Sequence, residues 1–168
     1  MVNTPRGYTI KKNFLKNMVK SNRYLCDTNY TNFNAQDDFV ITPVTIYKKR
    51  IWFKIVEFDE IKDSSTYNTE DWVNLVSVIE ANYDQFDAFV VLHGTDTMAF
   101  TASAISFMLE NLKKTVVITG KPWRIWSYKD YLGSQVPLCE MRNDAFDNIL
   151  GALTIAGISI DFIFRRQL

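Results

Sequence analysis

The sequence predicts an α/β fold, in which a mostly parallel sheet is flanked by helices, with a β-hairpin near residues 39–58. Short, nearly continuous apolar runs alternate with helical patterns in the second half of the chain, as expected for buried parallel strands that are joined by helices. Of the 168 residues, 47% are hydrophobic and 14% aromatic. This composition supplies enough apolar surface for about one folded domain and excludes a disordered chain.

The first third of the chain is polar and rich in Asn, and it precedes a β-rich region. Apolar residues in helical spacing over 14–19 predict a short helix of about two or three turns. Two β-rich runs follow at 39–47 and 51–58, and the basic residues 48–50 between them indicate a turn. Together the two runs and the turn predict the hairpin.

A helix and a βαβ unit are expected next. Asn68 or Thr69 provides a helix cap, and the two acidic residues that follow it predict a helix over 72–81. The βαβ unit consists of a strand, a helix and a second strand, at 86–92, 98–112 and 115–118. The two strands are apolar runs typical of a buried parallel sheet.

The last two expected elements are a helix and a strand. Residues 144–156 have helical spacing, and Gly157 follows in the position where glycine commonly ends a helix. The apolar run 158–164 then predicts a further strand.

Charge and cysteine content narrow the class of partner. Lys and Arg together number 19, as do Asp and Glu, so the chain has no general electrostatic attraction to nucleic acid or to an anionic membrane. Cys26 and Cys139 lack the spacing of a disulfide framework or a metal site. Residues 1–10 lack a secretory signal, and the apolar stretch 155–164 is shorter than the roughly 20 residues of a membrane span. We therefore expect a cytoplasmic protein with a small-molecule partner.

Residues suited to chemistry lie where the strand 86–92 ends and the next helix begins. Ligands of open α/β sheets bind beyond the carboxyl ends of the strands, close to helix N-termini. Gly94 allows a close turn there, Thr95 provides a hydroxyl and Asp96 a carboxylate. The same residue types also occur in ordinary loops, where Asp96 or Thr97 caps the helix and Thr95 shapes the turn. Taken alone, these residues favour the ordinary loop.

A resemblance to a known family changes that weighting. Residues 90–112, VVLHGTDTMAFTASAISFMLENL, closely resemble the second signature of bacterial-type L-asparaginases, in which HGTDTM holds the catalytic threonine and aspartate. Residues 58–72 resemble the family's substrate-binding loop, and residues 134–157 resemble the segment after its next strand. The likeness is strongest to the cytosolic type I branch, which includes lysophospholipase-asparaginase proteins. It implies a Rossmann-like N-terminal domain.

The resemblance implies a catalytic set and a reaction. Thr95 and Asp96 match the threonine and aspartate of a Thr-Lys-Asp set, and Tyr8 matches the mobile-loop tyrosine that polarises the nucleophile. The implied reaction is hydrolysis of L-asparagine to L-aspartate and ammonia through a covalent acyl-enzyme. The family uses no metal or cofactor and assembles as homodimers or tetramers.

The same resemblance implies the residues that bind the substrate. Ser64 matches the residue that binds the α-carboxylate, with Asp63 and Ser65 beside it. Asp96 receives the α-amino group, and Gly94 precedes the catalytic pair.

Three features depart from the family pattern. The TGGTIG motif with the first nucleophilic threonine is not among the 168 residues, and the catalytic lysine and the smaller C-terminal domain would lie beyond Leu168. Residues 121–133 interrupt the similarity, and we interpret them as an insertion of extra coding sequence. We therefore expect residues 1–168 to be an incomplete asparaginase N-terminal domain with impaired catalysis.

Two alternatives remain beside asparagine hydrolysis. One is a non-catalytic asparaginase-like domain that binds an amino acid or pairs with a homologous subunit. The other is a lysophospholipase or amidotransferase relative, because these proteins share the signature. His93, the single histidine, is expected to be a hydrogen-bonded structural residue and not a general base.

Overall fold

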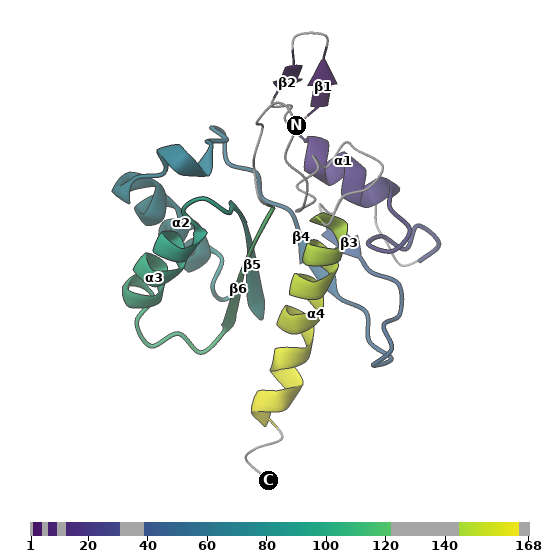
Figure 1. Cartoon of the computed structure of the whole chain (residues 1–168). Coiled ribbons are helices and arrows are strands. Elements are labelled where there is room, and N and C mark those ends of the chain that lie inside the picture. Colours follow the sequence, from purple (N-terminus) through teal and green to yellow (C-terminus); the bar gives the residue numbers. More distant parts are fainter. Residues whose placement is uncertain (1, 5–6, 10–12, 31–38, 122–144, 165–168) are drawn as a thin grey trace, which may run out of the picture. The chain divides into compact units, whose positions relative to one another are not determined.

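The computed structural model describes residues 2–4, 7–9, 13–30, 39–121 and 145–164, with side chains in 13–30, 39–120 and 145–157. The chain divides into two compact units, Met1–Ile61 and Lys62–Leu168. Figure 1 labels the helices and strands of each unit.

The first unit contains two antiparallel strand pairs and a helix. β1 (Val2–Thr4) pairs with β2 (Gly7–Thr9), and α1 (Phe14–Ser21) follows them. β3 (Phe39–Ile41) pairs with β4 (Trp52–Lys54). The short helix and the hairpin are confirmed, although the paired strands are shorter than the β-rich runs that predict them.

An ion pair holds the chain next to this hairpin. The Nη1 atom of Arg50 donates to Asp27 Oδ2 at 2.6 Å and to the backbone oxygen of Thr42 at 3.0 Å. The hydrogen bond from Arg50 holds the pKa of Asp27 below its ordinary value, because it favours the ionised carboxylate. The most buried apolar side chains of this unit are Val19, Leu25, Val40 and Ile41.

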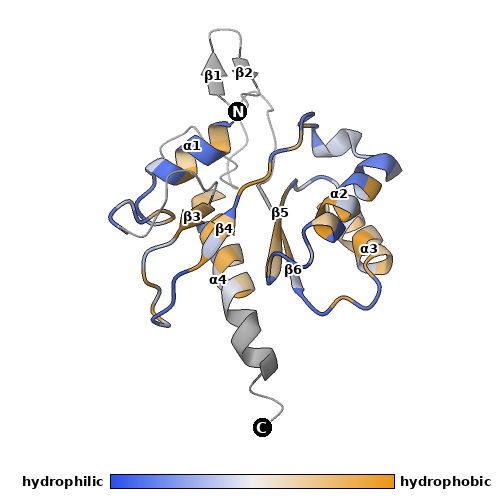
Figure 2. Ribbon diagram, turned by 180° about the vertical axis from the view of Figure 1, so that it is seen from behind, coloured by the Kyte–Doolittle hydropathy of each residue, from blue (hydrophilic) through white to orange (hydrophobic). Residues whose placement is uncertain are grey.

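The second unit is built on a parallel strand pair. β5 (Ala88–Gly94) and β6 (Thr115–Lys121) pair in register, and α3 (Met98–Met108) connects them. α2 (Thr69–Ala81) precedes the pair and α4 (Ala145–Phe164) follows it. Figures 1 and 2 place α2 and α3 on one side of the pair and α4 on the other. The predicted βαβ unit and the α/β class are confirmed.

Alternation along the strands explains this layering. Leu75 and Ile79 of α2 and Ile105 of α3 form a buried cluster. The strand residues packed against it are Phe89, Val91, Val116 and Ile118. Because neighbouring residues of a strand point to opposite faces, these four share the face toward α2 and α3. The most buried side chains of α4, which packs on β5 and β6, are Ala145, Ile149, Ala152, Leu153 and Ala156. Figure 2 shows β5 and α3 as apolar along most of their length.

The prediction for the end of the chain is wrong. α4 continues as one helix of 20 residues from Ala145 to Phe164, so Gly157 does not end it and 158–164 is not a strand. A glycine inside a helix costs about 1 kcal/mol relative to alanine, which a long helix tolerates. An apolar run of this length also fits a strand or a buried helix equally well. The predicted insertion over 121–133 lies outside the described residues, apart from Lys121 at the end of β6.

Gly151 in α4 allows a direct stability prediction. A Cβ added at this position would meet no atom within 4 Å, so Gly151→Ala introduces no clash. We expect the substitution to raise the free energy of unfolding by about 1 kcal/mol, because alanine restricts the unfolded chain more than glycine does. Urea unfolding followed by circular dichroism measures the change, and a destabilised variant would contradict the placement of α4.

Candidate functional site

The site forms where β5 ends and a short loop from earlier in the chain packs against it. Ser64 begins the 3-10 helix η1 (Ser64–Thr66) and is only 4% exposed. A Cβ added at Gly94, the last residue of β5, would lie 2.3 Å from Ser64 Oγ and 2.6 Å from Ser64 Cβ. Ser64 therefore occupies the space that a side chain at position 94 would need.

Thr97 ties the same two segments together. Its Oγ1 donates to the backbone oxygen of Ser64 at 2.6 Å. Thr97 is the N-cap residue of α3, but its side chain makes no capping hydrogen bond. The capping role expected for Thr97 in an ordinary loop is therefore not observed, because its hydroxyl binds η1 instead.

Thr95 lies at the carboxyl ends of both strands. A Cβ added at Gly120 of β6 would be 3.3 Å from Thr95 Cγ2 and 2.5 Å from the backbone oxygen of His93. Glycine at 120 thus allows β6 to approach both the end of β5 and Thr95 closely. Asp96 follows on the exposed side of the loop. The structure brings Ser64, Gly94 and Thr95 into one cluster.

The hydroxyl of Ser64 is unusual within this cluster. Its Oγ is buried and has no hydrogen-bond partner among the residues that the structure describes. Leaving a buried hydroxyl unpaired costs about 1–3 kcal/mol. Such a group calls for an explanation, and a bound ligand that accepts a hydrogen bond is one.

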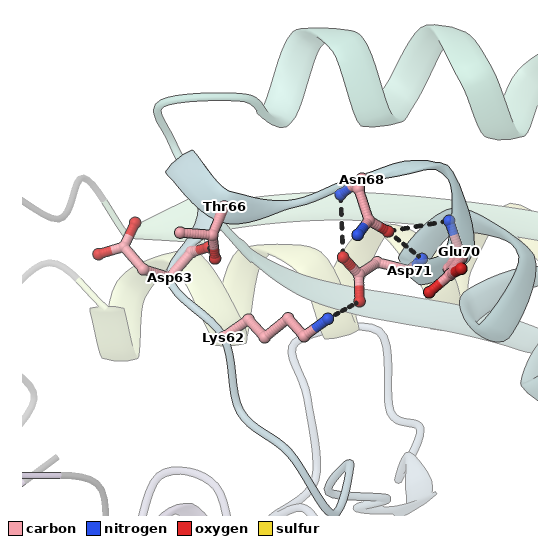
Figure 3. A network of polar contacts seen from close by, with 6 residues as sticks. All are labelled: Lys62, Asp63, Thr66, Asn68, Glu70 and Asp71. Atoms are coloured by element: carbon pink, nitrogen blue, oxygen red, sulfur yellow. Dashed lines mark hydrogen bonds and ion pairs between the residues drawn. The ribbon is translucent and has the colours of Figure 1, made fainter.

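Hydrogen bonds hold the loop around Ser64 at both ends, and Figure 3 shows those among Lys62, Asn68, Glu70 and Asp71. On one side, Asp63 Oδ1 accepts hydrogen bonds from the backbone N and the Oγ of Ser65, at 2.9 and 2.8 Å. On the other, Asn68 and Asp71 form a capping box at the start of α2. Lys62 Nζ donates to Asp71 Oδ1 at 2.9 Å. Of the two predicted cap residues, Asn68 and Thr69, the structure shows Asn68 as the cap. Both Asp63 and Ser65 are exposed beside Ser64.

Asp71 makes the stability of this loop dependent on pH. The hydrogen bond from Lys62, and then that from the backbone N–H of Asn68, hold the pKa of Asp71 below its ordinary value. A lowered pKa in the folded state stabilises the fold above the ordinary carboxyl pKa, near 4. This contribution is lost as the pH falls through the lowered pKa.

We expect Asp71→Asn to lower the free energy of unfolding by about 1 kcal/mol at pH 7. The difference from the unsubstituted chain should shrink as the pH falls below about 4, and urea unfolding over a pH series measures it. Glu70→Gln is the matched control, because Glu70 is an exposed acid in the same helical turn. An equal effect of both substitutions would mean that only the helix dipole is involved.

The other residues singled out by sequence are placed as follows. His93 is 7% exposed and hydrogen-bonded to Gly94 and Thr101, which confirms that the ring is buried and hydrogen-bonded as expected. Tyr8 lies in β2 of the first unit, where its backbone pairs with Asn3, and its side chain lies outside the described residues. Pattern alone did not single out the contacts of Thr97 or the close approach at Gly120.

The part of the chain that the structure describes contains neither a metal-binding cluster nor a membrane-spanning helix. In the ranges the structure covers, no group of His, Cys, Asp and Glu side chains could hold a metal ion. No helix in those ranges is long and apolar enough to cross a membrane.

Comparisons with known proteins point to one family. A family model described as "Asparaginase, N-terminal" matches residues 7–129. The chain is 37% identical over 153 residues to an L-asparaginase of Dirofilaria immitis, covering 89% of this chain and 24% of that protein. It is 41% identical over 121 residues to a human 60 kDa lysophospholipase, covering 72% of this chain and 19% of that protein.

A solved structure supports the same assignment. The crystal structure of L-asparaginase I from Vibrio cholerae matches with a TM-score of 0.52 at 48% identity, over 62% of this chain and 28% of that chain. The matched part of the chain thus spans between 19% and 28% of the length of these relatives. With the family model covering 7–129 and the HGTDTM signature at the end of β5, the chain belongs to the asparaginase family.

Proposed function

We propose that these residues form part of the active site of an L-asparagine amidohydrolase, which converts L-asparagine and water to L-aspartate and ammonia. The observation that carries the proposal is the cluster at the end of β5. The unpaired Ser64 hydroxyl is held against Gly94, one residue before Thr95. Two relatives named L-asparaginase share the family and support this substrate.

The binding part of the site suits the charges of an amino acid. The hydroxyl of Ser64 donates to the α-carboxylate of the substrate. Asp63 and Ser65, on either side of Ser64, form the rest of the loop that binds this carboxylate. The carboxylate of Asp96 accepts the positively charged α-amino group. A hydroxyl that donates to the carboxylate and a carboxylate that binds the ammonium together select a zwitterion, since each ligand charge meets a group of complementary character.

The catalytic part of the site uses hydroxyl chemistry. Thr95 presents its hydroxyl to the side-chain amide as the threonine of the Thr-Lys-Asp set. A threonine oxygen loses its proton and attacks the amide carbon, and the C–N bond breaks as the nitrogen takes up a proton and leaves as ammonia. Water then cleaves the resulting ester to release L-aspartate. A threonine hydroxyl is a weak nucleophile at neutral pH and needs a base. We assign that role to the family lysine, outside these 168 residues, with Tyr8 polarising the nucleophile.

We further propose that the protein acts in the cytoplasm as a homodimer or tetramer, without a cofactor and without nucleic-acid or membrane partners. Analytical ultracentrifugation tests the assembly. A monomer at micromolar concentration would contradict it.

Ammonia release tests the reaction. The gene product that contains these 168 residues is incubated separately with L-asparagine and L-glutamine, and with a lysophospholipid for fatty-acid release. We expect turnover of L-asparagine by the gene product and negligible turnover by the 168-residue chain alone. Release of fatty acid in place of ammonia would favour the lysophospholipase alternative, which the human relative supports. Amino-acid binding without any hydrolysis would favour the non-catalytic domain.

A further inference from the structure

His93 occupies a special position that the proposed reaction does not use. It is the single histidine of the chain and directly precedes the Gly94–Thr95 peptide. The ring is buried, and it contacts groups from three segments, the end of β5, α3 and the residue after η1.

The hydrogen bonds around the ring define its protonation. Nδ1 lies 2.6 Å from the backbone oxygen of Gly94, which only accepts, so Nδ1 carries a hydrogen. Nε2 lies 2.9 Å from Thr101 Oγ1. The Nε1–H of Trp72 donates to that same oxygen at 3.0 Å, which leaves one lone pair and the hydroxyl hydrogen of Thr101 for the contact with Nε2.

These contacts form a single directed chain of donors. In the assignment that gives every hydrogen an acceptor, Trp72 donates to Thr101, Thr101 donates to His93, and His93 donates to the oxygen of Gly94. Thr101 is fully buried, at 0% exposure. Among the described residues its hydroxyl hydrogen has no other recorded acceptor. The neutral ring with hydrogen on Nδ1 therefore satisfies every member, and buried polar chains are most stabilising when fully satisfied.

The ring also supports the segment that carries Ser64. The ring of Tyr67, the residue that follows η1, packs edge-on against His93 with centroids 4.6 Å apart and planes at 68°. His93 thus touches both sides of the cluster. It is hydrogen-bonded to the Gly94–Thr95 peptide. It also packs against Tyr67, which directly follows the turn that contains Ser64.

We infer that His93 is a positioning residue of the proposed asparaginase site, which acts as the neutral Nδ1–H ring by fixing the Gly94–Thr95 peptide. This inference rests on the proposed function for its catalytic consequence. The bond to the Gly94 oxygen sets the orientation of that peptide, and with it the direction in which Thr95 presents its hydroxyl. Misplacing a reacting group by about 1 Å costs roughly a hundredfold in rate.

Nitrogen NMR of the ring tests the protonation directly. Because the ¹⁵N-labelled 168-residue chain has one histidine, its spectrum contains one pair of imidazole nitrogens. We expect a protonated Nδ1 and an unprotonated Nε2 at pH 7. Thr101→Val should shift the Nε2 signal while Nδ1 stays protonated. The opposite tautomer, or a fully protonated ring, would overturn the inference.

Two substitutions separate positioning from packing. The amide of His93→Asn ends near the place of Nδ1 and can still donate to Gly94, whereas that of His93→Gln ends near Nε2 and reaches Thr101. We expect the backbone amide signals of Thr95 and Asp96 to move in His93→Gln and to stay near their original positions in His93→Asn. In the gene product, kcat for L-asparagine should fall about tenfold to a hundredfold in His93→Gln, with KM little changed. The variant His93→Asn should retain most of the original kcat.

The outcomes distinguish this inference from the proposed function. If the unsubstituted gene product hydrolyses no amide, the proposed function fails, and the tautomer and the Thr95 signals still decide the role of His93. If it is active but the two variants lose kcat equally, in step with their melting temperatures, His93 only packs the core. That result would overturn the inference and leave the function standing.

Discussion

Thr95→Val is expected to lower kcat for L-asparagine about a thousandfold in the gene product that carries these residues. Valine keeps the branched shape that packs beside Gly120, so the hydroxyl is the only group removed. Loss of a group that takes part in proton transfer or nucleophilic attack costs roughly a hundredfold to ten-thousandfold. Ammonia release at saturating L-asparagine measures the change.

Thr115→Val is the matched control for this prediction. Thr115 begins β6 and pairs with Ala88, at the end of the strands away from Gly94. Valine is favoured in strands, so kcat should stay unchanged. If Thr95→Val retained full activity, Thr95 would be a turn residue and the assignment of the site would fail. Retained binding of L-aspartate by Thr95→Val would show that Ser64 and Asp96 still hold the amino acid.

The second unit shows what sequence pattern predicts well. The strands at Ala88–Gly94 and Thr115–Lys121 and the helices at Thr69–Ala81 and Met98–Met108 all lie close to their expected positions. Each of them has a strong local signal, either an apolar run between turn residues or a cap followed by helical spacing. The capping box at Asn68 can be predicted because its signal, a cap residue with an acid three residues later, depends only on neighbouring residues.

The end of α4 shows where pattern fails. In the run after Gly157 (ISIDFIF), apolar residues alternate with Ser159 and Asp161, which is the spacing of a strand, so the local pattern favours the wrong element. The glycine is tolerated within α4 because its cost, about 1 kcal/mol, is small beside what the rest of the helix gains from packing. Ala152, Leu153 and Ala156, just before Gly157, are all buried.

The candidate site depended on more than pattern. The position of Gly94, Thr95 and Asp96 at a strand end favours a ligand site in an α/β sheet, but the same residues also fit an ordinary loop. Ser64 was found only through the family resemblance, because nothing local in residues 63–66 predicts a contact with a strand 30 residues later. Packing supplies that link, through the close approach of Ser64 to Gly94 and the bond from Thr97.

Gly94→Ala is expected to lower the free energy of unfolding by about 1–3 kcal/mol, because it overpacks this contact. Gly94 lies in the extended backbone of β5, so glycine is required there for space and not for an unusual conformation. The added methyl would lie 2.3 Å from Ser64 Oγ and 2.6 Å from Ser64 Cβ, and both are far inside contact distance. Binding of L-aspartate should weaken with stability, because Ser64 must move. Urea unfolding and calorimetry measure the two effects, with Gly151→Ala as the control for a glycine without neighbours.

Changes at Ser64 should relieve the clash in a defined order. Ser64→Ala removes only the oxygen and leaves a carbon 2.6 Å from the new methyl, so combining it with Gly94→Ala should restore little stability. Ser64→Gly removes both atoms, and the nearest one left is the backbone N of residue 64 at 3.6 Å, an ordinary contact. The double variant with Ser64→Gly should therefore show a coupling energy near the full cost of Gly94→Ala. Additive effects would mean that residues 64 and 94 do not touch. Because this cycle measures folding alone, it tests the geometry of the site whatever reaction the protein catalyses.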